Sequence, residues 1–152
     1  MAARITTDEG RRRRTPAFTI VAALAIAMAA PASAAATHVT FKKWIVTTSD
    51  GKKHKVKPGH KFKHCRDVLR IKAKGHYNQA TKGNTYNDVW SLNDTTILSS
   101  SHTWASDHGP IGIALFRNSG SPLPDGTYKL QITEGSTTVG HSKVKLATPS
   151  SC

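Results

Sequence analysis

The basic residues in the first part of this chain have the clearest chemical potential. From Ala35 to His76 the sequence has twelve lysines and arginines against two acidic residues, Asp50 and Asp67, whereas from Tyr77 onward five basic residues balance five acidic ones. Clustered cations raise a local positive potential that attracts polyanions, mainly through counterion release. The residues predicted to bind an anionic polymer are Lys52, Lys53, Lys55, Lys57, Lys61, Lys63, Arg66, Arg70, Lys72 and Lys74.

The expected ligand is an anionic polymer of the cell envelope or its surroundings: a teichoic acid, extracellular nucleic acid, or an anionic glycan. Aromatic residues that stack on bases are not interleaved among the lysines, so sequence-specific nucleic-acid recognition is not expected. The competing interpretation is a solvated basic face that only keeps the protein soluble. The leading hypothesis is therefore a non-enzymatic binding module.

The histidines suggest an alternative. All eight lie at or beyond His38, and on a basic domain one imidazole as base, another as acid and a lysine on the phosphate would cleave a phosphodiester. However, the chain has no G-x-S-x-G turn, Gly-rich phosphate loop or H-E-x-x-H motif. A small secreted phosphodiester hydrolase is the second hypothesis, and a protein–protein adhesin or inhibitor that uses the polar loops is the third.

No cofactor or metal site is predicted. His60 and His64, with Cys65 beside them, have a spacing that suits a metal ion, but Lys61 and Lys63 would repel a bound cation.

The two cysteines, Cys65 and Cys152, allow one intramolecular disulfide, which would pin the C-terminal residue. Disulfides persist in oxidising compartments outside the cytoplasm. A free thiol and an intermolecular bridge are the alternatives.

The N-terminal segment predicts export. Arg11–Arg14 precede a short apolar run, Thr19–Ala30, and Ala32-Ser33-Ala34 supplies small residues for cleavage. A permanent membrane span needs about 20 apolar residues, and no later stretch approaches that length. We expect residues 1–34 to be a signal peptide (or the cut to follow Ala35) and residues 35–152 to be one secreted domain, extracellular or envelope-associated. The oligomeric state is not predicted.

Period-two alternation dominates this domain. Val39–Thr48 is rich in β-branched and aromatic residues, and Asp50-Gly51 after it is a hairpin-turn signal leading into Lys52–Lys57. In Val68–Lys74 an apolar set alternates with a cationic set, which predicts a half-buried strand. These sets are Leu69, Ile71 and Ala73, and Arg70, Lys72 and Lys74.

Two polar segments are expected to be loops, His76–Asp88 and Ser99–Pro110. Trp104, in the second, is expected to cap the end of the fold; an exposed platform for a sugar ring is the alternative. The remaining predicted strands are Val89–Leu92, Thr95–Leu98, Ile111–Phe116, Thr127–Thr133 and a final strand through Val144 and Leu146. About seven short strands in one domain predict an all-β antiparallel sandwich.

Asp125-Gly126-Thr127-Tyr128-Lys129-Leu130 resembles the sixth strand of immunoglobulin-like and fibronectin-like sandwiches, including bacterial secreted domains. The resemblance covers Leu69 to Leu146. It implies an Ig-like topology, a tyrosine that hydrogen-bonds back across a corner, and a buried tryptophan at Trp90. It also implies that Cys65 and Cys152 meet at one end of the sandwich. The usual core cysteine two residues after the tyrosine is Leu130 here.

Overall fold

The computed structural model describes residues 36–152; the predicted signal peptide, residues 1–34, and its cleavage site lie outside them. Within this range the chain has nine strands and no helix, and therefore none long and apolar enough to cross a membrane. The strands are β1 (His38–Thr48), β2 (Lys53–Val56), β3 (Lys61–Lys63), β4 (Val68–Asn78), β5 (Thr85–Leu92), β6 (Thr95–Thr103), β7 (Gly109–Phe116), β8 (Gly126–Glu134) and β9 (Thr137–Ala147). The all-β prediction is confirmed.

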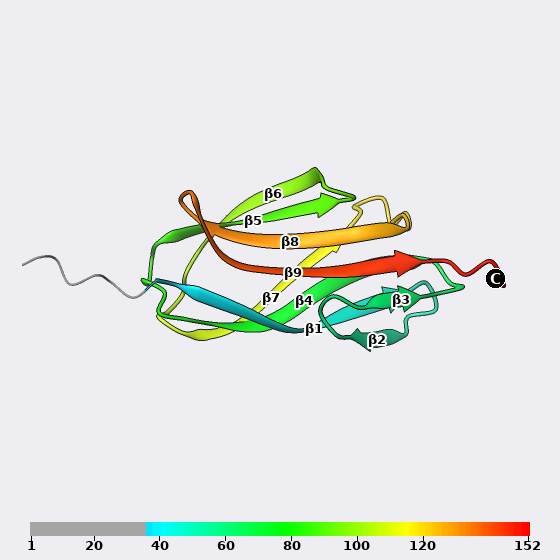
Figure 1. Cartoon of the computed structure of the whole chain (residues 1–152), viewed down its shortest axis with the longest axis horizontal. Coiled ribbons are helices and arrows are strands. Elements are labelled where there is room, and N and C mark those ends of the chain that lie inside the picture. The colour runs from blue at the N-terminus through cyan, green and yellow to red at the C-terminus, as the bar shows by residue number, and fades with distance from the viewer. Residues whose placement is uncertain (1–35) are drawn as a thin grey trace, which may run out of the picture. The chain divides into compact units, whose positions relative to one another are not determined.

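The strands form two sheets that pack face to face (Figure 1). The first sheet has the order β2-β1-β4-β7 and the second the order β3-β9-β8-β5-β6. The sandwich is confirmed, but it is not wholly antiparallel, because the short strand β3 pairs with β9 in parallel. Nine strands are present where about seven were expected: β2 lies within the predicted return segment of the hairpin, Lys52–Lys57, whereas β3 was not predicted.

The alternation read from the sequence places the core between the sheets. Ile71, Ala73, Tyr128, Leu130, Ile132, Val144 and Leu146 are buried as predicted. Leu69 is only half-buried, because the register of β1 and β4 shifts between Thr47 and Thr48 and leaves Leu69 without a partner. Gly75 allows β1 and β4 to approach closely, since a Cβ there would lie 2.1 Å from the carbonyl oxygen of Thr40.

Two tryptophans join the sheets at the centre. Trp44 of β1 and Trp90 of β5 are fully buried and meet edge to face, with ring centroids 5.7 Å apart. The Trp44 indole donates a hydrogen bond of 2.9 Å to the Ser142 hydroxyl on β9. This bond satisfies the buried indole N–H across the interface between the sheets.

Both predicted polar loops prove shorter than expected. β4 continues to Asn78 and β5 begins at Thr85; likewise β6 continues to Thr103 and β7 begins at Gly109. These extensions pair with β1, β7 and β5, and backbone pairing does not require an apolar side chain at each position. The predicted split at Asn93-Asp94 is confirmed as a two-residue hairpin turn, in which both residues have positive φ (49° and 69°).

The details implied by the resemblance are present. The Tyr128 hydroxyl donates to the Pro124 carbonyl oxygen at 2.7 Å, and Trp90 is fully buried. Trp104 caps one end of the core: it is 2% exposed and packs between Tyr77 and Tyr86. Burial excludes its use as a sugar platform.

The predicted disulfide between Cys65 and Cys152 is present. Because β3 and β9 run in the same direction, the residues that follow them emerge at one end of the sandwich (Figure 1). His64 fixes this end, with Nε2 2.9 Å from Asp125 and Nδ1 2.8 Å from the Arg66 carbonyl oxygen. Burial raises the pKa of Asp125, but the Thr148 backbone N–H and His64 outweigh it, so the pKa is lowered overall.

Replacing both cysteines by serine should lower the free energy of unfolding by about 4 kcal/mol, because the disulfide closes a loop spanning 87 residues in the unfolded chain. Urea unfolding of the oxidised protein and of Cys65→Ser/Cys152→Ser measures the difference. Equal midpoints would contradict this role for the bridge.

Alkaline pH should also destabilise the fold through Tyr128. Burial raises the pKa of this phenol to about 12 from its ordinary value of 10.0. The folded state therefore holds the proton more tightly, and this stabilisation is complete below pH 10 and lost as the pH rises toward 12. Between pH 10 and pH 12 the free energy of unfolding of Tyr128→Phe should therefore fall by about 2 kcal/mol less than that of the wild type. Urea unfolding of both proteins at several pH values measures this difference. If the unfolding free energies of the wild type and Tyr128→Phe change in parallel with pH, the Tyr128 phenol does not contribute in this way.

Candidate functional site

Arg70, Lys72 and Lys74 lie on the outer face of β4, as the alternation predicted. We call these three residues the cationic ladder. Arg70 and Lys74 are exposed and Lys72 is half-buried, while the intervening Ile71 and Ala73 are buried. The aliphatic stem of Lys72 lies across Gly112 of β7, where a Cβ would come within 2.8 Å of Lys72 Cε. At the end of the ladder, the Arg70 guanidinium lies over the Phe116 ring, 5.6 Å from its centroid.

Neighbouring strands extend the ladder sideways. Residues directly opposite each other in a ladder of strands point to the same face. Lys43 of β1 is the cross-strand partner of Lys74. On β2, Lys53 and Lys55 are opposite Thr47 and Ile45, which in turn are opposite Arg70 and Lys72. The basic face, as used below, consists of Lys43, Lys53, Lys55, Arg70, Lys72 and Lys74.

No member of the basic face forms an ion pair with a carboxylate anywhere in residues 36–152. Lys43 and Lys74 are like charges directly opposite each other, an arrangement that destabilises a sheet. Beside them is a hollow of about 280 Å³ whose lining includes Lys42, Lys43, Lys74 and His76. The face thus holds uncompensated positive charge around a shallow concavity.

Five of the ten predicted binding residues lie on the basic face, and the other five lie outside its three strands. Lys61 and Lys63 lie on β3, in the second sheet. Lys52 is in the β1–β2 turn, 3.6 Å from Asp50, and Lys57 follows β2. Arg66 lies next to the disulfide. The sequence did not reveal this division because β3 was not predicted. It was therefore not foreseen that the chain crosses from the first sheet to the second between β2 and β3.

A second basic hollow, of about 370 Å³, lies at the disulfide end. Lys52, Lys63, Arg66, His54 and His64 are among its lining residues, and the Phe62 ring packs between the two imidazoles, with centroids 5.0 and 5.9 Å away. Both ring nitrogens of His64 already contact acceptors, and the Cys65 sulfur is in the disulfide. His64 therefore has no free ring nitrogen for proton transfer or for a metal ion, and the Cys65 sulfur is not free to bind a metal ion.

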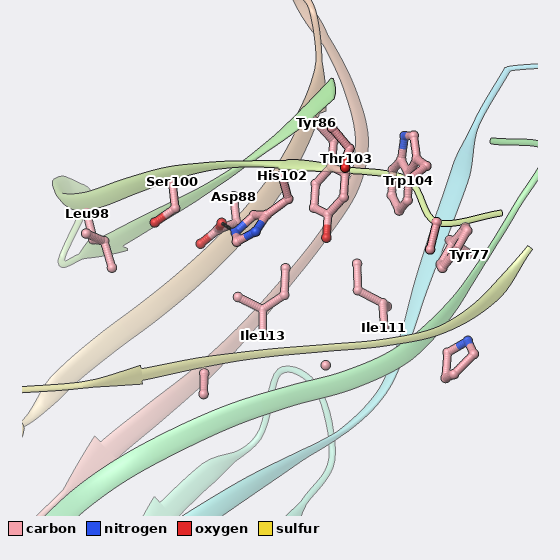
Figure 2. A pocket seen from close by; sticks show the side chains of 14 residues that line it. Tyr77, Tyr86, Asp88, Leu98, Ser100, His102, Thr103, Trp104, Ile111 and Ile113 are labelled. Carbon is pink, nitrogen blue, oxygen red and sulfur yellow. Dashed lines mark hydrogen bonds and ion pairs between the residues drawn. The ribbon is translucent and has the colours of Figure 1, made fainter. Parts of the chain in front are cut away.

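The sequence analysis missed a third site, a cleft of about 380 Å³ between β6 and β7 (Figure 2). At its base Asp88 of β5 is 2% exposed. Its carboxylate accepts hydrogen bonds from Trp90 Nε1 at 3.0 Å and from His102 Nε2 at 2.6 Å. A carboxylate only accepts hydrogen bonds, so the proton of neutral His102 is on Nε2 and Nδ1 carries the lone pair.

Stacked aromatic rings form one wall of this cleft. His102 packs on Tyr86, and Tyr86 on Trp104, with centroids 5.3 and 4.0 Å apart. Burial, with added effects of the Asp88 and Tyr77 charges, raises the pKa of Tyr86, so its hydroxyl remains protonated beyond the usual range. The opposite wall is apolar and includes Ile111 and Ile113 of β7 (Figure 2).

The cleft is open because of the residues that β6 turns inward. Leu98, Ser100 and His102 face the interior opposite Trp90, Asp88 and Tyr86. A serine and a histidine stand where large apolar side chains would close the sandwich. Asp88 was placed at the end of a predicted loop, and its pairing with a histidine 14 residues away depends on the β5–β6 register.

No family model and no curated protein matches the chain. Among solved structures, an immunoglobulin-like protein from Pseudomonas aeruginosa is similar, with 5% sequence identity and a TM-score of 0.44. The match covers 76% of this chain and 100% of that chain.

Replacing Asp88 by Asn should reverse the tautomer of His102. The amide oxygen would still accept from Trp90, leaving the amide N–H₂ to face His102 Nε2, which must then become the acceptor. Long-range ¹H–¹⁵N spectra at a pH where His102 is neutral should show the proton on Nε2 in the wild type and on Nδ1 in Asp88→Asn. An Nε2–H tautomer in both proteins would contradict the assigned role of Asp88.

Proposed function

We propose that this protein is a secreted, non-enzymatic binding module with an immunoglobulin-like fold, and that its basic face holds an anionic polymer. One observation carries the proposal: six cationic side chains from three adjacent strands share one face, and none has a carboxylate partner within residues 36–152. Such an arrangement raises the local potential and releases counterions when a polyanion binds.

The spacing of the cations suits a linear polymer. Alternate residues on a strand are about 7 Å apart and neighbouring strands about 5 Å apart. The basic face therefore offers a regular array of charges to an extended chain rather than a single pocket. Phe116, 54% exposed, is the large exposed aromatic on this face and already lies under Arg70. Recognition would thus depend on charge rather than on base stacking, in agreement with a ligand such as an envelope polymer, nucleic acid or acidic glycan.

The immunoglobulin-like assignment is supported by three features of the fold. These are the hydrogen bond from Tyr128 to Pro124, the buried Trp90, and a sheet order in which β8 lies between β5 and β9. Location outside the cytoplasm is supported by the disulfide, which would persist in an oxidising compartment.

The binding module has better support than the hydrolase. A two-histidine mechanism needs two free imidazoles near a lysine, yet His64 has both ring nitrogens occupied. The cleft beside Asp88 is lined by one histidine, His102, and by no lysine or arginine.

Neutralising the cationic ladder should weaken polymer binding in a salt-dependent way. For single-stranded DNA the slope of log K against log salt concentration is about 0.7 per contact. The triple variant Arg70→Gln/Lys72→Gln/Lys74→Gln should therefore lower that slope by about 2. Fluorescence titration of an oligothymidylate, and elution from heparin, over a series of sodium chloride concentrations measure the effect.

The matched control removes three exposed lysines from the outer face of the second sheet: Lys129→Gln/Lys143→Gln/Lys145→Gln. Both variants have the same net charge, so any difference reports position rather than total charge. Equal losses in the two variants, or binding that ignores salt, would overturn the proposal. Thermal unfolding confirms that each variant is folded.

A further inference from the structure

The cleft between β6 and β7 contains a costly feature that the proposed polymer binding does not use. Asp88 is almost wholly buried, and burying a carboxylate is unfavourable unless its hydrogen bonds compensate. Both of its oxygens are committed, one to Trp90 and one to His102, whose side chain is 46% exposed. Asp88 thus holds an accessible imidazole in one orientation.

Several polar groups of the cleft lining have no hydrogen-bond partner among the described residues, including His102 Nδ1, the Tyr86 hydroxyl, the Ser100 hydroxyl and the buried Trp104 Nε1. Figure 2 shows the Tyr86 hydroxyl directed toward the wall formed by Ile111 and Ile113, with His102 and Ser100 on the same side as Tyr86. With neutral His102, this edge offers one acceptor and two hydroxyls that can each donate and accept. Across the cleft lies an aliphatic surface.

The charges around the cleft select a neutral ligand. No lysine or arginine lines it, so an anionic group would meet Asp88 with only His102 to offset the repulsion. A cationic group would have to compete with His102 for Asp88 and would also be repelled by the basic domain as a whole. A sugar ring fits the remaining requirements, since it presents hydroxyls along its edge and C–H groups on its face.

We propose that this cleft binds a neutral sugar unit, with hydroxyls on His102, Tyr86 and Ser100 and a C–H face on Ile111 and Ile113. A volume of about 380 Å³ is near the lower end of small-molecule sites, which span about 300–1,000 Å³, and suits a mono- or disaccharide. Asp88 acts as a positioning residue that fixes the His102 tautomer. The site does not require the basic face, which belongs to the other side of the first sheet.

The test is a titration of the ¹⁵N-labelled protein with cellobiose, maltose and N,N′-diacetylchitobiose at high sodium chloride. High salt suppresses polyanion binding but leaves contacts with a neutral sugar intact, so failure here and failure of the polymer proposal are separable. At least one sugar should shift the backbone signals of Tyr86, Ser100, His102 and Ile113 in a saturable way. Variants His102→Gln and Tyr86→Phe should weaken that binding at least fivefold, and His141→Gln, an exposed histidine on the second sheet, should not.

His102→Gln keeps a donor for Asp88 and Tyr86→Phe keeps the stack on Trp104, so both variants are expected to fold; their amide spectra verify this. Asp88→Asn should both weaken sugar binding and move the proton of His102 from Nε2 to Nδ1. If Asp88 only supported the fold, the loss of binding would not accompany a change of tautomer. The proposal is overturned if none of the three sugars shifts the cleft signals, or if His102→Gln and Tyr86→Phe bind as the wild type does.

Discussion

The contact between Trp44 and Trp90 is the constraint on which the two sheets depend. The rings come from opposite sheets, are fully buried and meet edge to face, a geometry that aromatic pairs favour beyond the area they bury. The hydrogen bond from Trp44 to Ser142 adds a polar contact that fixes how far β1 lies from β9. Because an unsatisfied indole N–H in the core would be costly, this pair sets both the spacing and the lateral position of the sheets.

Both candidate sites follow from that arrangement through the period-two rule. Around the tryptophans, inward side chains are large and apolar, so the outward set on β1, β2 and β4 is free to carry lysine and arginine. At the edges formed by β6 and β7, the inward set includes Ser100 and His102, which do not fill the interior. The same alternation of inward and outward side chains therefore produces a charged outer face on β1, β2 and β4 and an open cleft between β6 and β7.

The sequence predicted best those strands in which one face is fully buried. Burial alternates strictly in residues 70–74 and in Thr127–Thr133, because each strand has a partner on both sides and a core below. β6 was cut short at Leu98 because an edge strand with exposed serines has no apolar pattern to read. β3 was missed for the same reason: its three residues have one half-buried side chain, Phe62. The excess of basic residues between Ala35 and His76 was recognised from composition. Its division between two sheets, like the pairing of Asp88 with His102, is set by strand order and register.

The two sites also share an energetic logic. Like charges on Lys43 and Lys74 and a buried carboxylate at Asp88 each work against folding, so neither is a feature that stability alone would retain. The first lies on a solvent-facing surface, and the second lies beside an edge strand, although its Asp88 accepts a hydrogen bond from Trp90 of the central pair. The disulfide at the β3–β9 end, reinforced by His64 and Asp125, supplies stability that does not depend on either region. A domain fixed at its centre and at one end can thus tolerate unfavourable electrostatics on a face and at an edge, which is where the two candidate sites lie.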